Sequence, residues 1–280
     1  MTNYIIAVSG GVDSVVLLHM MAKYKTTNRL IVAHFDHGIR TESDADARFV
    51  QELARQYRLP FEVRREELGA SASEQVARDR RYKFLNELAK KYDATIVTAH
   101  HQDDLVETIA INLERGTGWR GLSVFTDSTV VRPLLMKRKN ELYDYAVVHH
   151  LEWVEDETNQ SSAYLRNRLR KRIAILDPET INTIVALRNE QVYLRTQIEN
   201  ERKRYTALQS RHFFIMVPEN VALEILRLQT DARLTKPQLL QVLHGIKALH
   251  AGAEMTAGAG IKIRLTKTHF TFENTSQLLY

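Results

Sequence analysis

A glycine-rich turn near the start of the chain is the first group of residues whose types and spacing could do chemistry. It is the uninterrupted string Ser9, Gly10, Gly11, Val12, Asp13 and Ser14. Neighbouring glycines let several backbone N–H groups face one anion, and serine hydroxyls can donate to phosphate oxygens. Asp13 would repel phosphate unless a magnesium ion lay between them, so the string predicts a nucleotide phosphate site with a divalent ion. The alternative is a simple turn in which Ser9 and Asp13 cap a helix.

A second group, H-F-D-H-G-I-R, runs from His34 to Arg40. Its carboxylate, Asp36, could bind a second side of the same magnesium ion, and Arg40 could neutralise a phosphate. The alternative is a loop that is held together by its own hydrogen bonds.

A third group, T-A-H-H-Q-D-D-L-V-E-T, occupies residues 98–108. On a helix, His101, Asp104 and Glu107 are spaced three residues apart and share one face. Such a negative patch beside a phosphate site needs a cation, which could be magnesium or the ammonium group of an amino-acid substrate. A zinc site built from His100, His101 and Asp104 matches no usual ligand spacing. The alternative is an acid-rich helix start that complements the helix dipole.

Positive charge is concentrated in a run of five cations within seven residues, from Arg166 to Arg172. These side chains would repel one another unless phosphates or carboxylates lay nearby, which makes Arg166 and Arg168 candidates for binding an anion. The net charge of +5 also suggests an anionic partner. The alternative is a basic face that contacts only solvent.

Alternating strands and helices are predicted to position these groups. Short apolar runs predict strands at residues 4–8, 30–35, 61–63 and 94–99. Longer amphipathic runs predict helices at residues 13–24, 43–57, 73–92 and 102–114. This alternation predicts an α/β fold with a doubly wound parallel sheet. Because the first three groups each follow a strand, we expect them at the carboxyl edge of the sheet, where such folds bind ligands.

The second half of the chain has a different pattern. Pro178 interrupts the helical pattern at Asp177, because proline disfavours helix at the preceding residue. This break predicts a catalytic domain over residues 1–176 and a smaller, mostly helical domain over residues 177–280. In the smaller domain we expect a long helix at residues 180–208. We also expect a hairpin of two strands, at residues 261–265 and 269–272.

The composition excludes several classes of protein. The chain has no cysteine, which excludes disulfides, thiolate zinc sites, iron–sulfur clusters and any persulfide-carrying mechanism. No apolar run approaches the ~20 residues that a membrane-spanning helix needs. The first residues lack the pattern of a secretory signal, so we expect a cytoplasmic protein without a membrane partner.

The string from Ser9 to Ser14 resembles the pyrophosphate-binding loop of the N-type ATP pyrophosphatases, and no G-x-x-x-x-G-K-[ST] string of the Walker-type NTPases is present. The resemblance implies a Rossmann-like fold of the adenine nucleotide alpha hydrolase type. It also implies that ATP is cleaved to AMP and pyrophosphate, that AMP is transferred to an oxygen of the substrate, and that a nucleophile then displaces it.

Further strings within residues 4–172 resemble those of the tRNA(Ile)-lysidine synthases, in the same order. They are H-F-D-H-G-I-R, A-R-D-R-R-Y, T-A-H-H-Q-D-D, E-R-G-T-G and N-Q-S-S-A-Y-L-R-N-R. This resemblance implies adenylation of the oxygen on carbon 2 of the wobble cytidine, in tRNA(Ile) with a CAU anticodon. Free lysine would then displace AMP through its ε-amine and form lysidine. Many such synthases have a further C-terminal domain that helps to bind tRNA. This chain stops at Tyr280, so we expect either a short form or a protein that recognises tRNA through residues 177–280 and the basic face.

The resemblance also implies roles for individual residues. ATP and Mg²⁺ would bind at the glycine-rich turn. The expected catalytic residues are Asp13, Asp36, His101, Asp104, Glu107, Arg166 and Arg168. The first two would hold Mg²⁺, and the next three would hold lysine, with one carboxylate removing a proton from the attacking amine. The two arginines would bind the lysine carboxylate, the AMP phosphate or the tRNA backbone.

Two other functions are compatible with the same phosphate loop. One is a small-molecule synthetase such as NAD synthetase, and the other is a nucleotide-binding sensor without catalysis. A thiouridine or 2-thiocytidine synthase is nearly excluded because those enzymes rely on cysteines, which this chain lacks. A homodimer is compatible with the sequence.

Overall fold

The computed structural model describes residues 2–23, 29–38, 43–69, 73–155 and 165–274. The chain divides into two compact units, Met1–Val192 (unit 1) and Tyr193–Tyr280 (unit 2). This division lies within α7 (Pro178–Arg202), whereas the proline pattern suggested a boundary at residue 176. Ile181 and Val185 are buried in one cluster with apolar residues of α4 and α6, so the start of α7 packs within unit 1.

Unit 1 is built around a five-stranded sheet in the order β3-β2-β1-β4-β5. The strands are β1 (Asn3–Ala7), β2 (Arg29–Asp36), β3 (Phe61–Arg65), β4 (Ala94–Val97) and β5 (Val130–Val131). All neighbouring strands pair in parallel, and Ile5 of β1 aligns with Ile31 of β2 and Ile96 of β4. The predicted parallel α/β fold is therefore confirmed.

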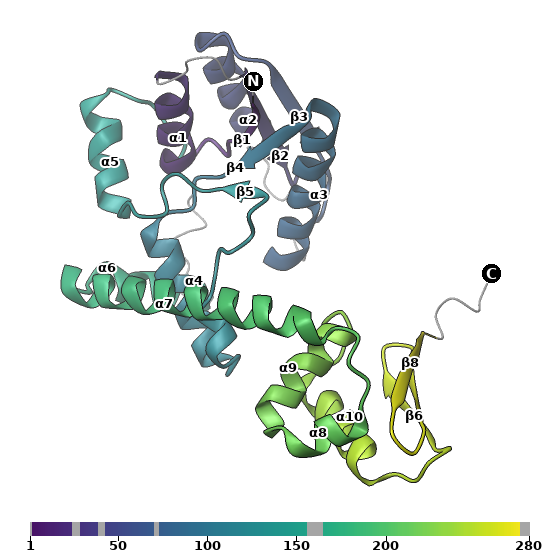
Figure 1. Ribbon diagram of the computed structural model, residues 1–280. Coiled ribbons are helices and arrows are strands. Elements are labelled where there is room, and N and C mark those ends of the chain that lie inside the picture. The colour runs from purple at the N-terminus through teal and green to yellow at the C-terminus, as the bar shows by residue number, and fades with distance from the viewer. Residues whose placement is uncertain (1, 24–28, 39–42, 70–72, 156–164, 275–280) are drawn as a thin grey trace. The chain divides into compact units, whose positions relative to one another are not determined.

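Helices follow the strands in the expected alternation (Figure 1). In unit 1 they are α1 (Val12–Lys23), α2 (Ser43–Gln56), α3 (Glu74–Tyr92), α4 (Gln102–Glu114), α5 (Lys139–Val148), α6 (Leu165–Ala174) and the start of α7, with a short 3₁₀ helix at Trp119–Gly121. Within the part of the chain that the structure describes, no helix is long and apolar enough to cross a membrane.

The sheet is buried on both faces because its side chains alternate between two helical layers. Ile5 and Ile6 are both 0% exposed, yet they belong to different apolar clusters. Ile6 packs with residues of α1, α2 and α5, whereas Ile5 packs with residues of α3 on the opposite face. Such double coverage explains why the strand sequences are continuously apolar and not alternating.

The strand order places a switch point at the carboxyl edge of the sheet. β1 pairs with β2 on one side and with β4 on the other, so the chain reverses its direction of winding at β1. Ligands of open α/β sheets bind at such a switch point, between the loops that leave the two central strands. Here those loops carry the glycine-rich turn after β1 and His101 after β4.

Unit 2 combines helices with a small antiparallel sheet. Its helices are the end of α7, a 3₁₀ helix at Lys203–Tyr205, α8 (Arg211–Met216), α9 (Glu219–Gln229) and α10 (Lys236–Ala248). Its strands are β6 (Glu254–Gly258), β7 (Ile261–Leu265) and β8 (Phe270–Asn274), in the order β6-β7-β8. The hairpin of β7 and β8 is confirmed, while the sequence pattern missed β6. Phe214 and Phe270 are 0% exposed and meet edge to face in the core of this unit.

Candidate active site

The glycine-rich turn connects β1 to α1 and is organised by one serine hydroxyl. Ser14 Oγ accepts hydrogen bonds from the N–H groups of Ser9 and Gly10, each at 3.2 Å, and donates to Gly11 O at 2.8 Å. Two N–H groups therefore converge on a single oxygen, as they would on a phosphate oxygen. Gly10 has a φ of +96°, which residues with a Cβ rarely adopt. Ser14 is buried and Ser9 is exposed, and their hydroxyl oxygens lie 3.2 Å apart, within hydrogen-bond distance.

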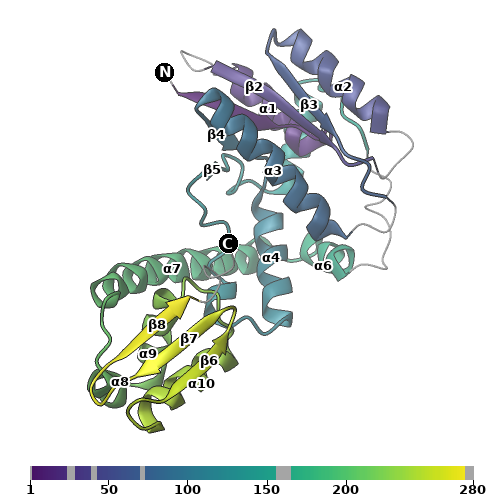
Figure 2. The same ribbon diagram turned by 90° about the vertical axis from the view of Figure 1, so that its right-hand side faces the viewer.

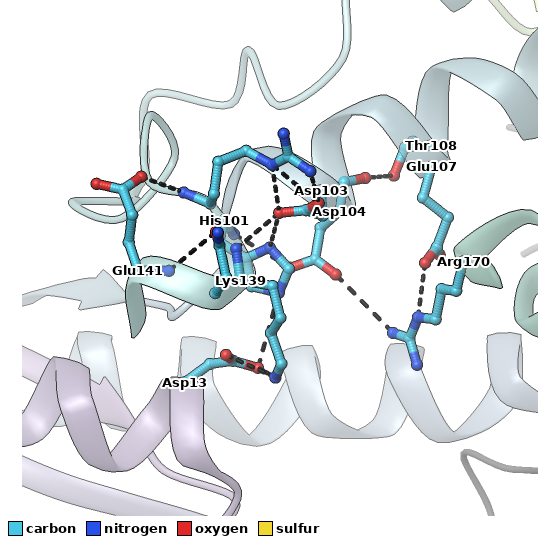
Figure 3. Close-up of polar contacts among 11 residues, drawn as sticks. Asp13, His101, Asp103, Asp104, Glu107, Thr108, Lys139, Glu141 and Arg170 are labelled. Atoms are coloured by element: carbon cyan, nitrogen blue, oxygen red, sulfur yellow. Dashed lines mark hydrogen bonds and ion pairs between the residues drawn. The ribbon is translucent and has the colours of Figure 1, made fainter. Parts of the chain in front are cut away.

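Asp13, in the first turn of α1, is paired with an ammonium group. Lys139 Nζ lies 2.7 Å from each of the two carboxylate oxygens of Asp13. His101 Nε2 is 3.7 Å from Asp13 Oδ2. The starts of α1, α4 and α5 thus meet at this carboxylate, as Figure 3 shows. A cation therefore already lies at the carboxylate where the sequence predicted a divalent ion.

His101 is surrounded by carboxylates. Its Nε2 lies 3.4 Å from Asp104 Oδ2, and its Nδ1 lies 3.7 Å from Asp103 Oδ2. The side chain is 8% exposed, and Nδ1 has no hydrogen-bond partner within the described residues. The backbone N–H of His101 also donates to Asp104 Oδ2 at 3.1 Å, which fixes this carboxylate at the helix start. These carboxylates hold the imidazole in a fixed place between the glycine-rich turn and α4.

Asp103 joins the start of α4 to the start of α5. Arg138 Nε donates to both oxygens of Asp103, at 3.1 and 3.2 Å, and the backbone N–H of Lys139 donates to it at 2.7 Å. These bonds hold the backbone of Lys139 against α4, so that its ammonium group reaches Asp13. Asp103 therefore positions the cation and is not itself directed at the glycine-rich turn.

Glu107 is a buried carboxylate one turn further along α4. It is 1% exposed, and its Oε2 accepts a hydrogen bond from Arg170 Nε at 2.7 Å. Arg170 Nη2 also lies 3.9 Å from Asp104 Oδ1, so one guanidinium group spans both acids (Figure 3). Asp104 and Glu107 therefore share an acidic face of α4, as predicted, and Arg170 of α6 neutralises it.

Asp36 lies at the end of β2 and has other partners. Its Oδ1 accepts a hydrogen bond from the N–H of Gly38 at 2.9 Å, and Arg65 Nη1 lies 3.4 Å from its Oδ2. The carboxylate is 3% exposed, so little of it faces solvent. The structure thus places Asp36 at the predicted edge of the sheet, at the last residue of β2. Arg40 lies outside the described residues.

The basic run of α6 contributes a different arginine from those expected. Arg168 is exposed and lines a shallow pocket with Glu114 and Arg172, near the end of α4. Arg170 is two residues further on and reaches Glu107. Residues two apart on a helix point to different sides, so only one of them can face the acids. The side chain of Arg166 lies outside the described residues.

Lys139, Arg138 and Arg170 are the site residues that the sequence pattern missed. A signal for the first two exists in the run Lys137-Arg138-Lys139, which opens a helix with positive charge. Cations at a helix N-terminus oppose the helix dipole, so such a run indicates anions nearby. The sequence could not tell which anions, because Asp13 and Lys139 are 126 residues apart.

His100 differs sharply from its neighbour. Its Nδ1 lies 2.8 Å from Thr98 Oγ1, and its ring lies 4.8 Å from that of Phe125. Burial lowers the pKa of His100 from the usual 6.5 to about 3, and the charges of Arg78 and Arg81 add to this effect. His100 is therefore neutral at neutral pH.

This low pKa predicts a pH-dependent stability. Between pH 6.5 and about 3 the unfolded chain binds a proton at His100 that the folded chain refuses, so stability is lost as pH falls through this window. On lowering the pH from 7 to 4, we expect the wild type to lose about 3 kcal/mol more than His100→Asn. Both tryptophans, Trp119 and Trp153, lie in unit 1, so urea unfolding followed by tryptophan fluorescence reports on this unit. Equal losses in the two proteins would contradict the prediction.

The donors at this edge suit one kind of metal ion. Within the described ranges, no group of three or more histidine, cysteine, aspartate or glutamate side chains is arranged to hold a metal ion. His100 contacts Thr98 and Phe125, so the structure does not bring it together with His101 and Asp104. Mg²⁺ needs only one or two carboxylates, since water and substrate phosphates complete its shell. The carboxylate oxygens of Asp13 are ligands of this kind, and Lys139 Nζ, which lies 2.7 Å from both of them, must move aside for the ion to bind there.

Comparison with known proteins identifies the family. The model of the PP-loop domain matches residues 1–176, which include the glycine-rich turn and the start of α4. The chain belongs to the PP-loop family. Among solved structures, the U34-tRNA thiolase NcsA from Methanococcus maripaludis has a TM-score of 0.58 over 69% of this chain and 73% of that one. At 16% identity this likeness concerns the PP-loop fold alone.

Curated relatives within the PP-loop family are closer in sequence. A tRNA(Ile)-lysidine synthase of Thermotoga maritima is 37% identical over 193 residues, which are 65% of this chain and 47% of the relative. One from Exiguobacterium sibiricum is 41% identical over 175 residues, which are 60% of this chain and 42% of the relative. The matched part of the chain thus corresponds to less than half the length of these relatives.

Proposed function

We propose that this PP-loop protein ligates lysine to carbon 2 of the wobble cytidine of tRNA(Ile) with a CAU anticodon, at the expense of ATP. The observation that carries the proposal is the juxtaposition of two sites through His101. One is the glycine-rich turn with Asp13, and the other is the acidic face of Asp104 and Glu107. The similarity to proteins named tRNA(Ile)-lysidine synthase supports the same reaction.

The first site binds ATP in this proposal. The N–H groups of the turn bind the outer phosphates, and the cytidine oxygen attacks the α-phosphorus with pyrophosphate as the leaving group. Lys139, which is 47% exposed, can turn from Asp13 to a phosphate oxygen. Mg²⁺ held by Asp13 and Asp36 would supply positive charge to the departing pyrophosphate. His101 then lies between the nucleotide and the acidic face.

The second site binds lysine. Asp104 and Glu107 attract its ammonium groups, because a buried carboxylate strongly favours a cationic partner. Arg170 is positioned by Glu107 and can bind the lysine carboxylate with its planar fork of N–H groups. Either Asp104 or His101 accepts the proton that the ε-ammonium must lose before the neutral amine attacks carbon 2 and AMP leaves.

The tRNA contacts a wider surface. We assign residues 177–280 to tRNA contact, together with the exposed cations of α6, and the net charge of +5 favours an anionic partner. The strength of such contacts falls steeply with salt, because each neutralised phosphate releases counterions.

The test is an incubation with labelled lysine, ATP, Mg²⁺ and a transcript of tRNA(Ile) with the CAU anticodon. We expect label to enter the tRNA in equal amounts with released pyrophosphate and AMP, and omission of any component to stop both. Asp104→Asn should reduce labelling strongly, whereas Asp79→Asn, an exposed acid on α3, should leave it unchanged.

Two outcomes would contradict the proposal. Pyrophosphate released with an ammonia donor and no tRNA would identify a small-molecule synthetase. ATP binding without any pyrophosphate would identify a nucleotide sensor, and Asp13→Asn would then leave its function intact.

A further inference from the structure

The string E-R-G-T-G, residues 114–118, has no role in the chemistry above. It ends α4 and leads into the 3₁₀ helix Trp119–Gly121. Asn112 holds this loop, because its backbone oxygen accepts from the N–H and Oγ1 of Thr117, at 3.1 and 3.0 Å, and its Nδ2 donates to Gly121 O at 3.0 Å. Both glycines of the string have a φ of +66°, which a residue with a Cβ rarely adopts. The loop therefore has a defined shape that fixes where its side chains lie.

Trp119 is a large side chain of this loop that lies outside the apolar cores. It is half-buried, and among the residues that the structure describes it packs in none of the apolar clusters of either unit. The other tryptophan, Trp153, packs against the core that contains residues of α1 and β1. The guanidinium carbon of Arg120 lies 4.4 Å from the centroid of the Trp119 ring. Because burial in a core does not explain the Trp119–Arg120 pair, the pair is a candidate binding surface.

Two exposed arginines flank the same end of α4. Arg115 is the C-cap residue of α4, and Arg172 of α6 lines the shallow pocket that also contains Glu114. Glu114 is the acid next to both arginines. Across the described ranges of the chain, Arg115, Arg172 and Glu114 form no ion pair. The nearby acid therefore leaves both guanidinium groups able to bind an anion.

The loop lies at the end of α4 that is remote from the candidate active site. α4 has 13 residues, so at about 1.5 Å per residue it is about 20 Å long. Its start carries His101 and Asp104, and Figure 2 shows its other end pointing away from the sheet. A lysine, or a nucleotide whose phosphates lie at the glycine-rich turn, does not span this length. A polynucleotide that places one base at His101 can span it with its neighbouring nucleotides.

We propose that the loop of residues 115–120 binds the RNA substrate outside the active site, with an unpaired base stacked on Trp119 and a backbone phosphate held by Arg115. Unpaired bases of RNA stack on aromatic rings and on guanidinium planes, and the Trp119–Arg120 pair offers both. A phosphodiester accepts charge-assisted hydrogen bonds from an arginine fork. The inference rests on the proposed function, since it takes the RNA that is modified at the start of α4 to be the ligand. It adds a contact in unit 1 to those assigned to residues 177–280.

The phosphate contact is tested with the tRNA(Ile) transcript that has the CAU anticodon, by filter retention at about 50 to 200 mM salt without lysine. For Arg115→Gln we expect the slope of log affinity against log salt to fall by about one unit, as for one lost phosphate contact. Arg115→Lys keeps the charge and should retain the slope. Arg58→Gln is the matched control and should behave as the wild type. Arg58 is likewise an exposed arginine of unit 1 that forms no ion pair with the described part of the chain.

The stacking contact is tested by removing the ring of Trp119. For Trp119→Leu we expect about tenfold weaker tRNA binding, and Trp119→Phe should recover most of the affinity because it keeps a ring on which a base can stack. The KM for tRNA should rise by the same factor, while the KM for ATP should not change. The chain has two tryptophans, so in a Trp153→Phe background the fluorescence comes from Trp119, and saturating tRNA should quench it.

Four outcomes would overturn this inference. If the wild type ligates lysine but Arg115→Gln and Trp119→Leu bind tRNA as it does, the loop alone is refuted. If Trp119→Leu raises the KM for ATP and leaves tRNA binding unchanged, the ring stacks the adenine of ATP. If Trp119→Phe binds as weakly as Trp119→Leu, no base stacks on the ring. If the wild type binds no tRNA, the proposed function fails as well. Far-UV circular dichroism of each variant separates these results from misfolding.

Discussion

Glu107→Gln is expected to slow the transfer of lysine by about 100- to 1,000-fold, because truncating one partner of a buried, hydrogen-bonded charge pair costs several kcal/mol. Glu107 is 1% exposed and its carboxylate bonds to Arg170 at 2.7 Å. Glutamine keeps the shape and removes the charge. Arg170 then loses its anchor, and the acidic face loses one of the charges that attract an ammonium group.

The Glu107→Gln substitution should impair the binding and transfer of lysine and should leave the reaction with ATP unchanged. The KM for lysine should rise, since Glu107 lies nearly two helical turns along α4 from His101, away from the glycine-rich turn. Exchange of pyrophosphate into ATP in the presence of tRNA should change little. Glu114→Gln, at the exposed end of the same helix, is the matched control and should retain activity. A loss of pyrophosphate exchange equal to the loss of lysine transfer would contradict the assignment of Glu107 to lysine.

The sequence was sufficient to predict the sheet and the position of the turn. Continuous apolar runs such as residues 30–35 have one common explanation, a strand buried on both faces, and Ile5 and Ile6 illustrate it. The alternation with helices then fixes which loops share an edge. Asp13 and His101 could be placed near each other on this basis alone, and the structure brings them to 3.7 Å.

Contacts between distant segments could not be predicted in this way. Arg170 and Glu107 are 63 residues apart, and the rotation of α6 decides whether Arg168 or Arg170 faces the acids. That rotation depends on where Leu169 and Ile173 pack against α4. The strand β6 was missed for a related reason, because its sequence E-M-T-A-G has no apolar or β-branched run and its strand character comes from pairing with β7. The local sequence pattern is sufficient to predict helices and strands, whereas the packing between them determines which side chains come into contact.

The paired ions of the site suggest how it stays folded without substrates. A carboxylate at the switch point, such as Asp13, and the acids of α4 would repel one another if no cation were near. Lys139 and Arg170 neutralise them from α5 and α6. Both cations are partly exposed, at 47% and 44%, so either can exchange its partner for a ligand at moderate cost. In this view substrate binding is an exchange of ion pairs.

The exchange leads to a second strong prediction, for Lys139→Met. We expect pyrophosphate release to fall by about 100-fold, as for the loss of one group that stabilises charge in a transition state. The ammonium lies 2.7 Å from both oxygens of Asp13, and methionine removes it while keeping an apolar stem of similar length. Because Asp13 then loses the ammonium group that competes with Mg²⁺ for its oxygens, the Mg²⁺ concentration for half-maximal rate should fall. Lys137→Met is the matched control, since Lys137 pairs with Glu141 at 3.0 Å on the same helix start. A purely structural role for Lys139 would lower stability and leave the Mg²⁺ dependence unchanged, and a rate within about twofold of wild type would remove Lys139 from the phosphate site.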